Sequence, residues 1–303
     1  MLNHLFSMQV MIFLLIIVGI LLYKTKIITD EGERCLTDMT ISLIIPCNIV
    51  GSFMIGLDGE ILKKCFIALV ISVCIQIGYA ILSRTLYNQF DREKKKVLQY
   101  GTVCSNAGFM GNAIAEGLYG SMGLLYAALY LIPVRIVIWS AGVSIFTESP
   151  DRRTLIKKVM THPCIVAVYI GMFLMITQIT PPEFLSSTVN AIGKCNTPMT
   201  MMIVGLILAK VNIRTLCSWT AIYYTCIRLV LIPLLVLIGC RLFHVDGLVT
   251  GVSVLLAGMP AGSTTAIFAS KYHGDGEFAT KIVVFSTIVS LITIPVWCII
   301  CGA

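Results

Sequence analysis

Charged residues are scarce in this 303-residue chain: only 12% of its residues are Asp, Glu, Lys or Arg, whereas 57% are hydrophobic. Soluble domains carry about 25% charged and about 45–50% apolar residues. So few charged groups cannot cover a water-facing surface of this size, which excludes a soluble enzyme and a disordered chain. The net charge of +7 is distributed over short loops between apolar runs, so it does not indicate nucleic-acid binding.

Signatures of catalysis and metal binding are missing as well. The four histidines lie near the ends of apolar runs, without a His-Glu-x-x-His motif or other ligand spacing. A glycine-rich phosphate loop is also missing, so the chain has no ATPase of its own. The 12 cysteines are irregularly spaced within apolar segments, which is typical of small buried hydrophobic residues rather than of disulfides. We therefore expect no enzyme, no cofactor and no metal site.

Long apolar runs are what the sequence has instead. A membrane-spanning helix needs about 20 mostly apolar residues. The first run lacks a positive leading segment and an A-x-A site, so we interpret it as a retained helix rather than a signal peptide. The sequence predicts an all-α polytopic membrane protein embedded in the lipid bilayer. The ten predicted transmembrane helices are 5–23, 36–56, 65–87, 97–118, 121–147, 163–180, 189–209, 217–240, 247–269 and 279–301.

Positive charges alternate between the loops. Sixteen lysines and arginines lie in the odd-numbered loops, and three lie in the even-numbered loops and termini. Cytoplasmic loops carry the excess of Lys and Arg, so the odd loops are predicted to face the cytoplasm and both termini the outside of the plasma membrane. The sixteen are Lys24, Lys26, Arg34, Arg84, Arg92, Lys94, Lys95, Lys96, Arg152, Arg153, Lys157, Lys158, Lys210, Arg214, Lys271 and Lys281; the three are Lys63, Lys64 and Arg241.

The chain divides into two similar halves. Residues 1–147 and 163–303 each contain five predicted spans, and a charged cytoplasmic linker, 148–162, joins them. A shift of 152 positions places Pro46 on Pro198 and Gln76 on Arg228. Because five is an odd number, the second half must be inverted relative to the first. Inverted repeats are a common architecture of secondary transporters.

The fourth and ninth spans contain small and polar residues near the middle of the membrane. Proline removes an N–H and glycine tolerates unwound backbone, so both segments are predicted to break. The alternative is that small residues only permit close helix packing. Half-helices beginning near residues 112 and 262 would direct their positive N-terminal ends at the bilayer centre. Together these ends would form a binding site for an anion. The candidate substrate-binding residues are Asn106, Gly108, Gly111, Asn112, Pro260, Ala261, Gly262, Ser263 and Thr264.

Four ionisable residues are candidates for coupling or charge attraction, because ionisable groups inside membrane spans are functional hypotheses by default. Arg228 and Arg135 lie deep in their spans, where each either braces the protein through backbone carbonyls or attracts the substrate. Glu116 and Asp38 are the two carboxylates that could carry a coupling proton. Alternatively, Glu116 pairs with a cation or reaches the outer interface, and backbone carbonyls at the breaks bind sodium.

These motifs together resemble the auxin efflux carrier family, which includes bacterial malate permease-like proteins and has a bile acid/sodium symporter-like fold. The resemblance covers nearly the whole chain. It implies ten helices as two inverted five-helix repeats, with crossing broken helices four and nine and a transport domain that moves like an elevator against a scaffold. One departure is Ala113, where the family commonly has proline. The resemblance includes residues 105–111, Leu118-Tyr119-Gly120, His162-Pro163, Thr197-Pro198, Gly205, Arg228, Pro233, Gly258-Met259-Pro260-Ala261 and Ile294-Pro295.

The resemblance implies a secondary carrier that moves a small organic anion, such as a dicarboxylate, a monocarboxylate or an auxin-like acid. Two alternatives stay open: a carrier for a neutral or zwitterionic metabolite such as an amino acid, and a ligand-binding membrane sensor on the same fold. We expect the sequence end at Ala303, directly after the last span, to favour a carrier over a sensor. The other partners considered are a coupling proton or sodium ion and a second copy of the chain in a homodimer.

Overall fold

The computed structural model describes residues 2–54, 58–138, 143–146, 156–157, 160–210, 216–271 and 274–302. These residues form helices and their connections, and one isolated β-bridge between Ser105 and Ala261 is the extended pairing among them. The predicted all-α fold is therefore confirmed for the described part of the chain. Most of the predicted linker 148–162 lies outside the described residues.

Several helices have the length and apolarity to cross a membrane. Within the described residues there are six such stretches, and shorter apolar helices cover Val10–Lys24, Pro163–Thr177 and Gly247–Ala257. This composition is consistent with a multi-pass membrane protein, while the count of ten spans in two inverted halves stays a prediction. The six stretches are Asp30–Ser52, Gly59–Leu86, Met110–Val137, Glu183–Ala209, Trp219–Leu242 and Gly276–Cys301.

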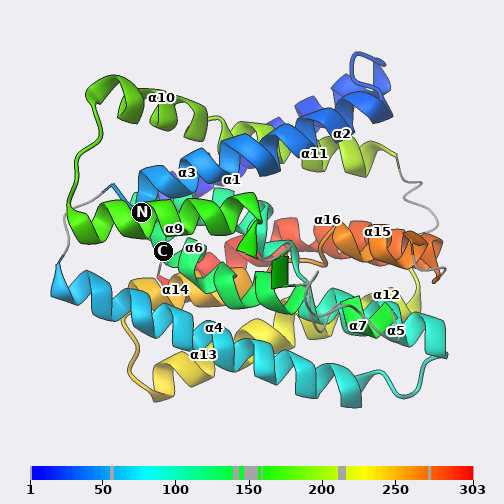
Figure 1. The fold of residues 1–303 in the computed structure, drawn as a ribbon. Helices are drawn as coiled ribbons and strands as arrows, with labels where there is room; N and C mark the ends of the chain where they lie inside the picture. Colours follow the sequence, from blue (N-terminus) through cyan, green and yellow to red (C-terminus); the bar gives the residue numbers. More distant parts are fainter. Residues whose placement is uncertain are drawn as a thin grey trace.

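Their packing contacts divide the helices into two groups, which we call the upper group and the lower group because most of the first lies at the top of Figure 1, with α9 level with α6 and α16. In the upper group, α1 packs on α11, and α3 packs on α9 and α10. The α1–α11 contact depends on Gly19 and Gly205, because a Cβ on Gly205 would lie 2.1 Å from the Ile16 carbonyl oxygen. The upper group consists of α1 (Leu2–Lys24), α2 (Asp30–Met39), the π-helical turn Thr40–Ile44, α3 (Ile45–Ser52), α9 (Pro163–Thr177), α10 (Glu183–Gly193) and α11 (Asn196–Ala209).

The lower group contains both predicted helix breaks. Its helix α6 packs on α4 and α14 and also contacts α1, α3, α9 and α11, so α6 is the main link between the two groups. The group consists of α4 (Gly59–Leu86), α5 (Arg92–Val103), α6 (Met110–Val137), α7 (Val143–Phe146), α12 (Trp219–Cys226), the π-helical turn Ile227–Leu231, α13 (Ile232–Leu242), α14 (Gly247–Ala257), α15 (Thr264–Lys271) and α16 (Gly276–Cys301).

Both helix breaks are present where the sequence places them. Between α5 and α6 the chain forms only a short 3-10 turn, Asn106–Gly108, and between α14 and α15 it leaves the helix from residue 258 to 263. The half-helices begin at Met110 and Thr264, two residues away from the expected positions. A further kink occurs inside α6 at Gly120, whose φ of 64° is left-handed and favours glycine. This kink separates the predicted fourth and fifth spans.

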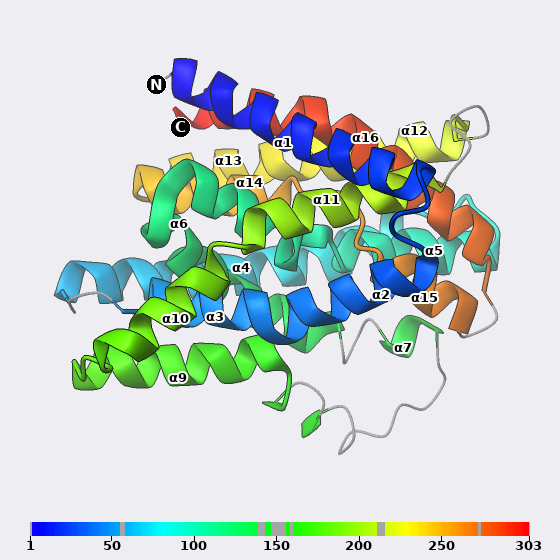
Figure 2. The same ribbon diagram turned by 90° about the horizontal axis from the view of Figure 1, so that it is seen from above.

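The two chain termini lie near each other at one end of the molecule in both views (Figures 1 and 2). The turns that join α9 to α10 and α13 to α14 lie at that same end, whereas the turns that join α1 to α2 and α4 to α5 lie at the opposite end (Figure 1). The helix ends next to the α1–α2 and α4–α5 turns carry eight of the sixteen positive charges of the odd-numbered loops, so these eight charges lie opposite the termini. Which end faces the cytoplasm stays a prediction from the charge count.

Candidate functional site

The two helix breaks cross in direct backbone contact. The amide N–H of Asn106 donates to the carbonyl oxygen of Pro260 at 2.8 Å, and the N–H of Gly262 donates to the carbonyl of Cys104 at 3.1 Å. A Cβ on Gly262 would lie 3.0 Å from that same carbonyl oxygen, which is tighter than side chains normally allow. Unwound backbone inside a membrane protein requires such partners, because lipid offers none. The two breaks therefore satisfy part of each other's backbone hydrogen-bonding capacity.

A cavity of about 170 Å³ lies at the crossing, between the upper and lower groups. Phe109, just before α6, and Thr264, the first residue of α15, both line it, so the N-terminal ends of the two half-helices face this cavity. The lining residues are Thr37, Ile41, Ile45, Ser105, Asn106, Gly108, Phe109, Leu131, Val134, Arg135, Ile138, His162, Cys164, Ile203, Val204, Ile207, Gly262, Ser263 and Thr264. We call it the crossing cavity.

Five of the nine predicted binding residues line the crossing cavity, and four do not. Those that line it come from both breaks: Asn106, Gly108, Gly262, Ser263 and Thr264. The other four, Gly111, Asn112, Pro260 and Ala261, are buried residues that hold the crossing together.

Asn112 and Gly111 fix the first turn of α6. The Asn112 side-chain amide donates to the carbonyl oxygen of Gly108 at 3.3 Å, which closes the turn before the helix. A Cβ on Gly111 would lie 2.6 Å from the Leu256 side chain, so glycine lets α14 approach α6 closely. These two residues therefore shape the cavity without lining it. Ala113 is fully buried in the same turn, and the break forms without the family's proline.

Arg135 brings a positive charge to the crossing cavity. The residue is 6% exposed, and its Nη1 has no hydrogen-bond partner among the described residues. Its Nη2 lies 3.8 Å from the position that a Cβ on Gly108 would occupy, so the guanidinium reaches the first break. Among the lining residues there is no Asp or Glu to neutralise it. Among the described lining residues, Arg135 is therefore a cation without a neighbouring carboxylate.

His162, next to this arginine, stays uncharged at neutral pH. Burial and the positive charge of Arg135 lower the pKa of His162 to about 4. Its Nδ1 accepts a hydrogen bond from the Cys164 N–H at 3.2 Å, which caps the start of α9 and requires an unprotonated nitrogen. His162 therefore adds a neutral polar surface to the cavity.

Sequence reasoning missed several lining residues. Ser105 and His162 stood in motifs of the family resemblance but were not proposed as site residues. Apolar residues of α11, which include Ile203 and Ile207, line one side of the cavity. The sequence does not distinguish them from the apolar residues of any transmembrane helix. Their position follows only from how α11 packs against α6.

Glu116 lies in a different polar cluster, at the contact between the two helix groups. Its carboxylate accepts a hydrogen bond of 2.8 Å from the side-chain amide of Asn48 on α3. Asn48 in turn donates to the carbonyl of Gly193 and accepts from the Asn196 amide, both at 3.2 Å. Glu116 therefore joins α6 to both α3 and α11. We call these residues the Glu116 cluster.

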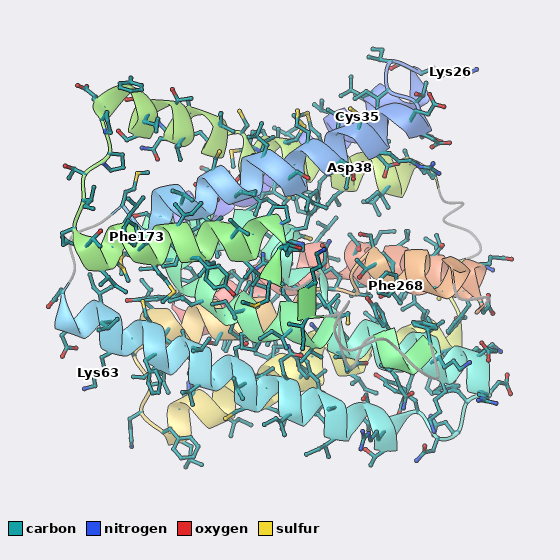
Figure 3. All side chains as sticks on the ribbon, in the orientation of Figure 1. Lys26, Cys35, Asp38, Lys63, Phe173 and Phe268 are labelled. Carbon is teal, nitrogen blue, oxygen red and sulfur yellow. The ribbon has the colours of Figure 1, made fainter. Side chains whose placement is uncertain are left out.

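Asp38 and Arg228 lie apart from the crossing cavity. Asp38 is exposed on α2 (Figure 3). Arg228 is fully buried in the π-helical turn between α12 and α13. Its three guanidinium nitrogens have no hydrogen-bond partner among the described residues, so it does not brace backbone carbonyls as one sequence interpretation held.

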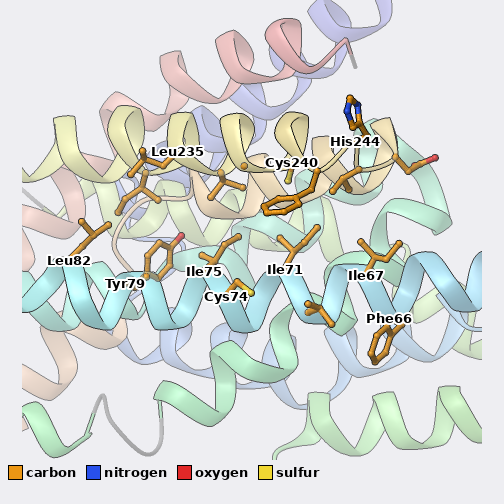
Figure 4. Close-up of a pocket in the computed structure, with 18 residues that line it drawn as sticks. Phe66, Ile67, Ile71, Cys74, Ile75, Tyr79, Leu82, Leu235, Cys240 and His244 are labelled. Atoms are coloured by element: carbon orange, nitrogen blue, oxygen red, sulfur yellow. The ribbon is translucent and has the colours of Figure 1, made fainter.

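A larger groove of about 690 Å³ runs between α4 and α13 (Figure 4). Its lining is mostly aliphatic and aromatic, and Phe66 and Phe243 at its rim are exposed. At one end Lys64 forms an ion pair of 2.8 Å with Asp246. None of the residues of the helix breaks lines this groove, so we do not assign the substrate to it despite its size.

The described residues thus define a class: a helical multi-pass membrane protein with a cavity between two broken helices, lined by polar and apolar residues. Comparison with known sequences agrees. The sequence model of the family described as "Membrane transport protein" matches residues 4–159 and again 152–298. The chain belongs to this membrane transport protein family, and the predicted resemblance to auxin efflux carriers is confirmed.

Relatives span most of the chain. An uncharacterised transporter from Methanothermobacter thermautotrophicus is 23% identical over 296 residues, which cover 95% of this chain and 96% of the relative. An uncharacterised transporter from Methanocaldococcus jannaschii is 21% identical over 296 residues, with coverage of 94% and 95%. The transporter YfdV from Escherichia coli K12 is 23% identical over 199 residues, 63% of each chain. The family and these relatives are transporters rather than enzymes.

Proposed function

We propose that the chain is a secondary carrier for small organic anions and that the substrate binds in the crossing cavity. The observation that carries this proposal is Arg135, a buried and uncompensated cation among lining residues that include no carboxylate. An uncompensated buried charge is costly, so such a site favours a ligand that supplies the opposite charge. Dicarboxylates, monocarboxylates and auxin-like acids all carry a carboxylate that matches the planar guanidinium.

The helix ends support the same ligand chemistry. The N-terminal ends of α6 and α15 face the cavity, and helix N-termini attract anions through free N–H groups and the helix dipole. Asn106 and Ser263 supply side-chain hydrogen-bonding groups beside them. A volume of 170 Å³ corresponds to roughly five or six water molecules at about 30 Å³ each, which suits a small solute.

An amino acid is the less suitable ligand. Its ammonium group needs an acceptor with negative charge, and the lining residues offer none. The Arg135 guanidinium would also repel that ammonium group. The zwitterion therefore stays the second candidate.

We further propose that transport is an elevator-type movement of the lower helix group against the upper one. The crossing cavity lies between the two groups, with the breaks on the lower side and α2, α9 and α11 on the upper side. The packing of α1 on α11 and of α3 on α9 pairs helices of the first half with those of the second, as two inverted repeats would. This arrangement supports the proposed ten-span, inverted organisation.

Proton coupling through Glu116 fits this movement. Glu116 is part of α6, and its hydrogen bond to Asn48 crosses from the lower to the upper group. Protonation would change this contact, and hence the relative stability of the two arrangements. A carrier that moves an anion against the membrane potential works against about 2.3 kcal/mol per charge per 100 mV, and one co-transported proton cancels that charge. Asp38, exposed on α2, is the weaker candidate.

An uptake screen tests the proposed function. The purified chain in proteoliposomes is given labelled dicarboxylates, monocarboxylates and amino acids under imposed pH or sodium gradients. The proposal predicts saturable uptake of at least one carboxylate that depends on a gradient, with little uptake of amino acids. Uptake of amino acids alone, or no uptake above empty liposomes for any carboxylate, contradicts it.

A further inference from the structure

Arg228 is a fully buried cation that the proposed substrate site does not use. Its side chain is 0% exposed, and it lies in the π-helical turn Ile227–Leu231 between α12 and α13. Neither Arg228 nor the tyrosines around it line the crossing cavity. Its charge therefore needs an explanation of its own.

No acidic partner compensates this charge in the described part of the chain. The ion pairs found there involve Lys64, Lys94, Lys96, Lys210 and Lys281, and none includes Arg228. Gln76 is the residue of the first half that corresponds to Arg228 when the halves are aligned with a shift of 152 positions. It is 5% exposed and neutral. A buried ion without a partner is strongly unfavourable, so something must supply a negative charge or acceptor.

Tyrosines from three helices surround the guanidinium. The Tyr79 ring of α4 lies below it, with 5.0 Å between the ring centroid and Cζ. Figure 4 shows this side chain projecting from α4 towards α13. A cation–π contact is weaker than the cost of burying an ion, so Tyr79 alone does not compensate Arg228.

The other two tyrosines offer hydroxyl groups without partners. Tyr130 of α6 and Tyr224 of α12 are 1% and 0% exposed, and both are electrostatic neighbours of Arg228. Among the described residues, neither hydroxyl has a hydrogen-bond partner, and neither do Nε, Nη1 and Nη2 of Arg228. Five buried atoms that can donate hydrogen bonds, three on Arg228 and one on each tyrosine, thus have no partner among the described residues. What this cluster lacks is an acceptor with negative charge.

We propose that Arg228, Tyr130 and Tyr224 form a buried binding site for a monatomic anion of the size of chloride, inside the lower helix group. Such an anion accepts several hydrogen bonds at once and neutralises the guanidinium, which a water molecule does not. The residues are almost completely buried, so a monatomic ion fits this place better than a carboxylate substrate. The site lies beside the crossing, because a Cβ on Gly101 of α5 would lie 2.8 Å from the Tyr224 hydroxyl and 3.6 Å from the Ala261 side chain. None of its three residues lines the crossing cavity.

Direct binding of radioactive chloride to the detergent-purified chain tests this site. Chloride is varied against gluconate at constant ionic strength, so that only the small anion changes. We expect saturable binding of about one ion per chain. Arg228→Gln should abolish it, and Tyr130→Phe and Tyr224→Phe should each weaken it about tenfold or more, because a hydrogen bond to a charged group is lost. The two phenylalanine variants decide the question if Arg228→Gln does not fold.

Two control variants locate the bound ion. Tyr126→Phe removes a hydroxyl from the same helix as Tyr130, one turn away, and should leave chloride binding unchanged. Arg241→Gln removes an exposed arginine at the end of α13 and should also leave it unchanged. The proposal is overturned if the folded wild-type chain shows no saturable chloride binding, or if binding is lost in a control variant. Because no transport is measured, failure here leaves the carrier proposal standing.

Discussion

Replacement of Arg135 by glutamine removes the one full positive charge among the described lining residues of the crossing cavity while retaining a polar side chain of similar length. A hydrogen bond to a charged group contributes about 1.5–3 kcal/mol, which corresponds to about 10-fold to 150-fold in a dissociation constant. We therefore expect Arg135→Gln to weaken binding of an organic anion by at least about tenfold. The affinity of Arg135→Lys should lie between those of the wild type and Arg135→Gln, because lysine retains the charge but loses the planar guanidinium group.

Isothermal titration of the purified variants measures this effect, with the carboxylate that gives the highest uptake as ligand. Arg241→Gln is the matched control: Arg241 is exposed at the end of α13, so its loss should not change affinity. The thermal midpoint of Arg135→Gln should not fall sharply, because Nη1 makes no hydrogen bond to the described residues. A folded Arg135→Gln variant with wild-type affinity would refute the reasoning that this charge selects the substrate.

Three further predictions follow from the contacts. Asn106 lines the cavity and Asn112 does not, so Asn106→Ala should weaken anion binding about tenfold. Asn112→Ala should instead lower the thermal midpoint and change the binding affinity little. The reverse pattern would contradict the assignment of Asn106 to the binding site and of Asn112 to its support. Glu116→Gln mimics the protonated carboxyl, so it should abolish accumulation driven by a pH gradient while sparing exchange of substrate for substrate, and continued pH-driven accumulation would exclude Glu116 as the proton carrier. Gly205→Ala should destabilise the chain by about 1–3 kcal/mol, because its Cβ would lie 2.1 Å from a carbonyl of α1, whereas Gly239→Ala, with open space around it, should be neutral or slightly stabilising; equal thermal midpoints would contradict the close α1–α11 contact.

Local chemistry explains what the sequence predicted well. The helix breaks were predictable because glycine and proline act on their own backbone, as in residues 105–111 and around Pro260. The direct pairing of Ser105 with Ala261 agrees with the predicted crossing. Eight of the sixteen positive charges of the odd-numbered loops lie at the end opposite the termini, and the orientation in the membrane stays a prediction (Figure 1).

Packing between distant segments explains what the sequence could not predict. Asn106 lines the cavity and Asn112 does not, and this difference depends on packing such as the close approach of α14 to Gly111, which the sequence does not reveal. Glu116 finds its partner in Asn48, 68 positions earlier in the chain. Two of the neighbours of Arg228, Tyr79 and Tyr130, likewise come from helices far from it in sequence, so the lack of a counter-charge among the described residues became visible only in the fold.

Protection of a single cysteine tests the central claim, that the substrate binds between the two helix breaks, most directly. Ser263→Cys, in a chain whose native cysteines are replaced, places a thiol in the crossing cavity, and Asn88→Cys places one at the distant connection between α4 and α5. The rate of reaction with a water-soluble maleimide is measured with and without the transported carboxylate. The account predicts that the carboxylate slows modification at position 263 in a saturable way and leaves position 88 unchanged. Equal rates at position 263 with and without a carboxylate that is transported would contradict it.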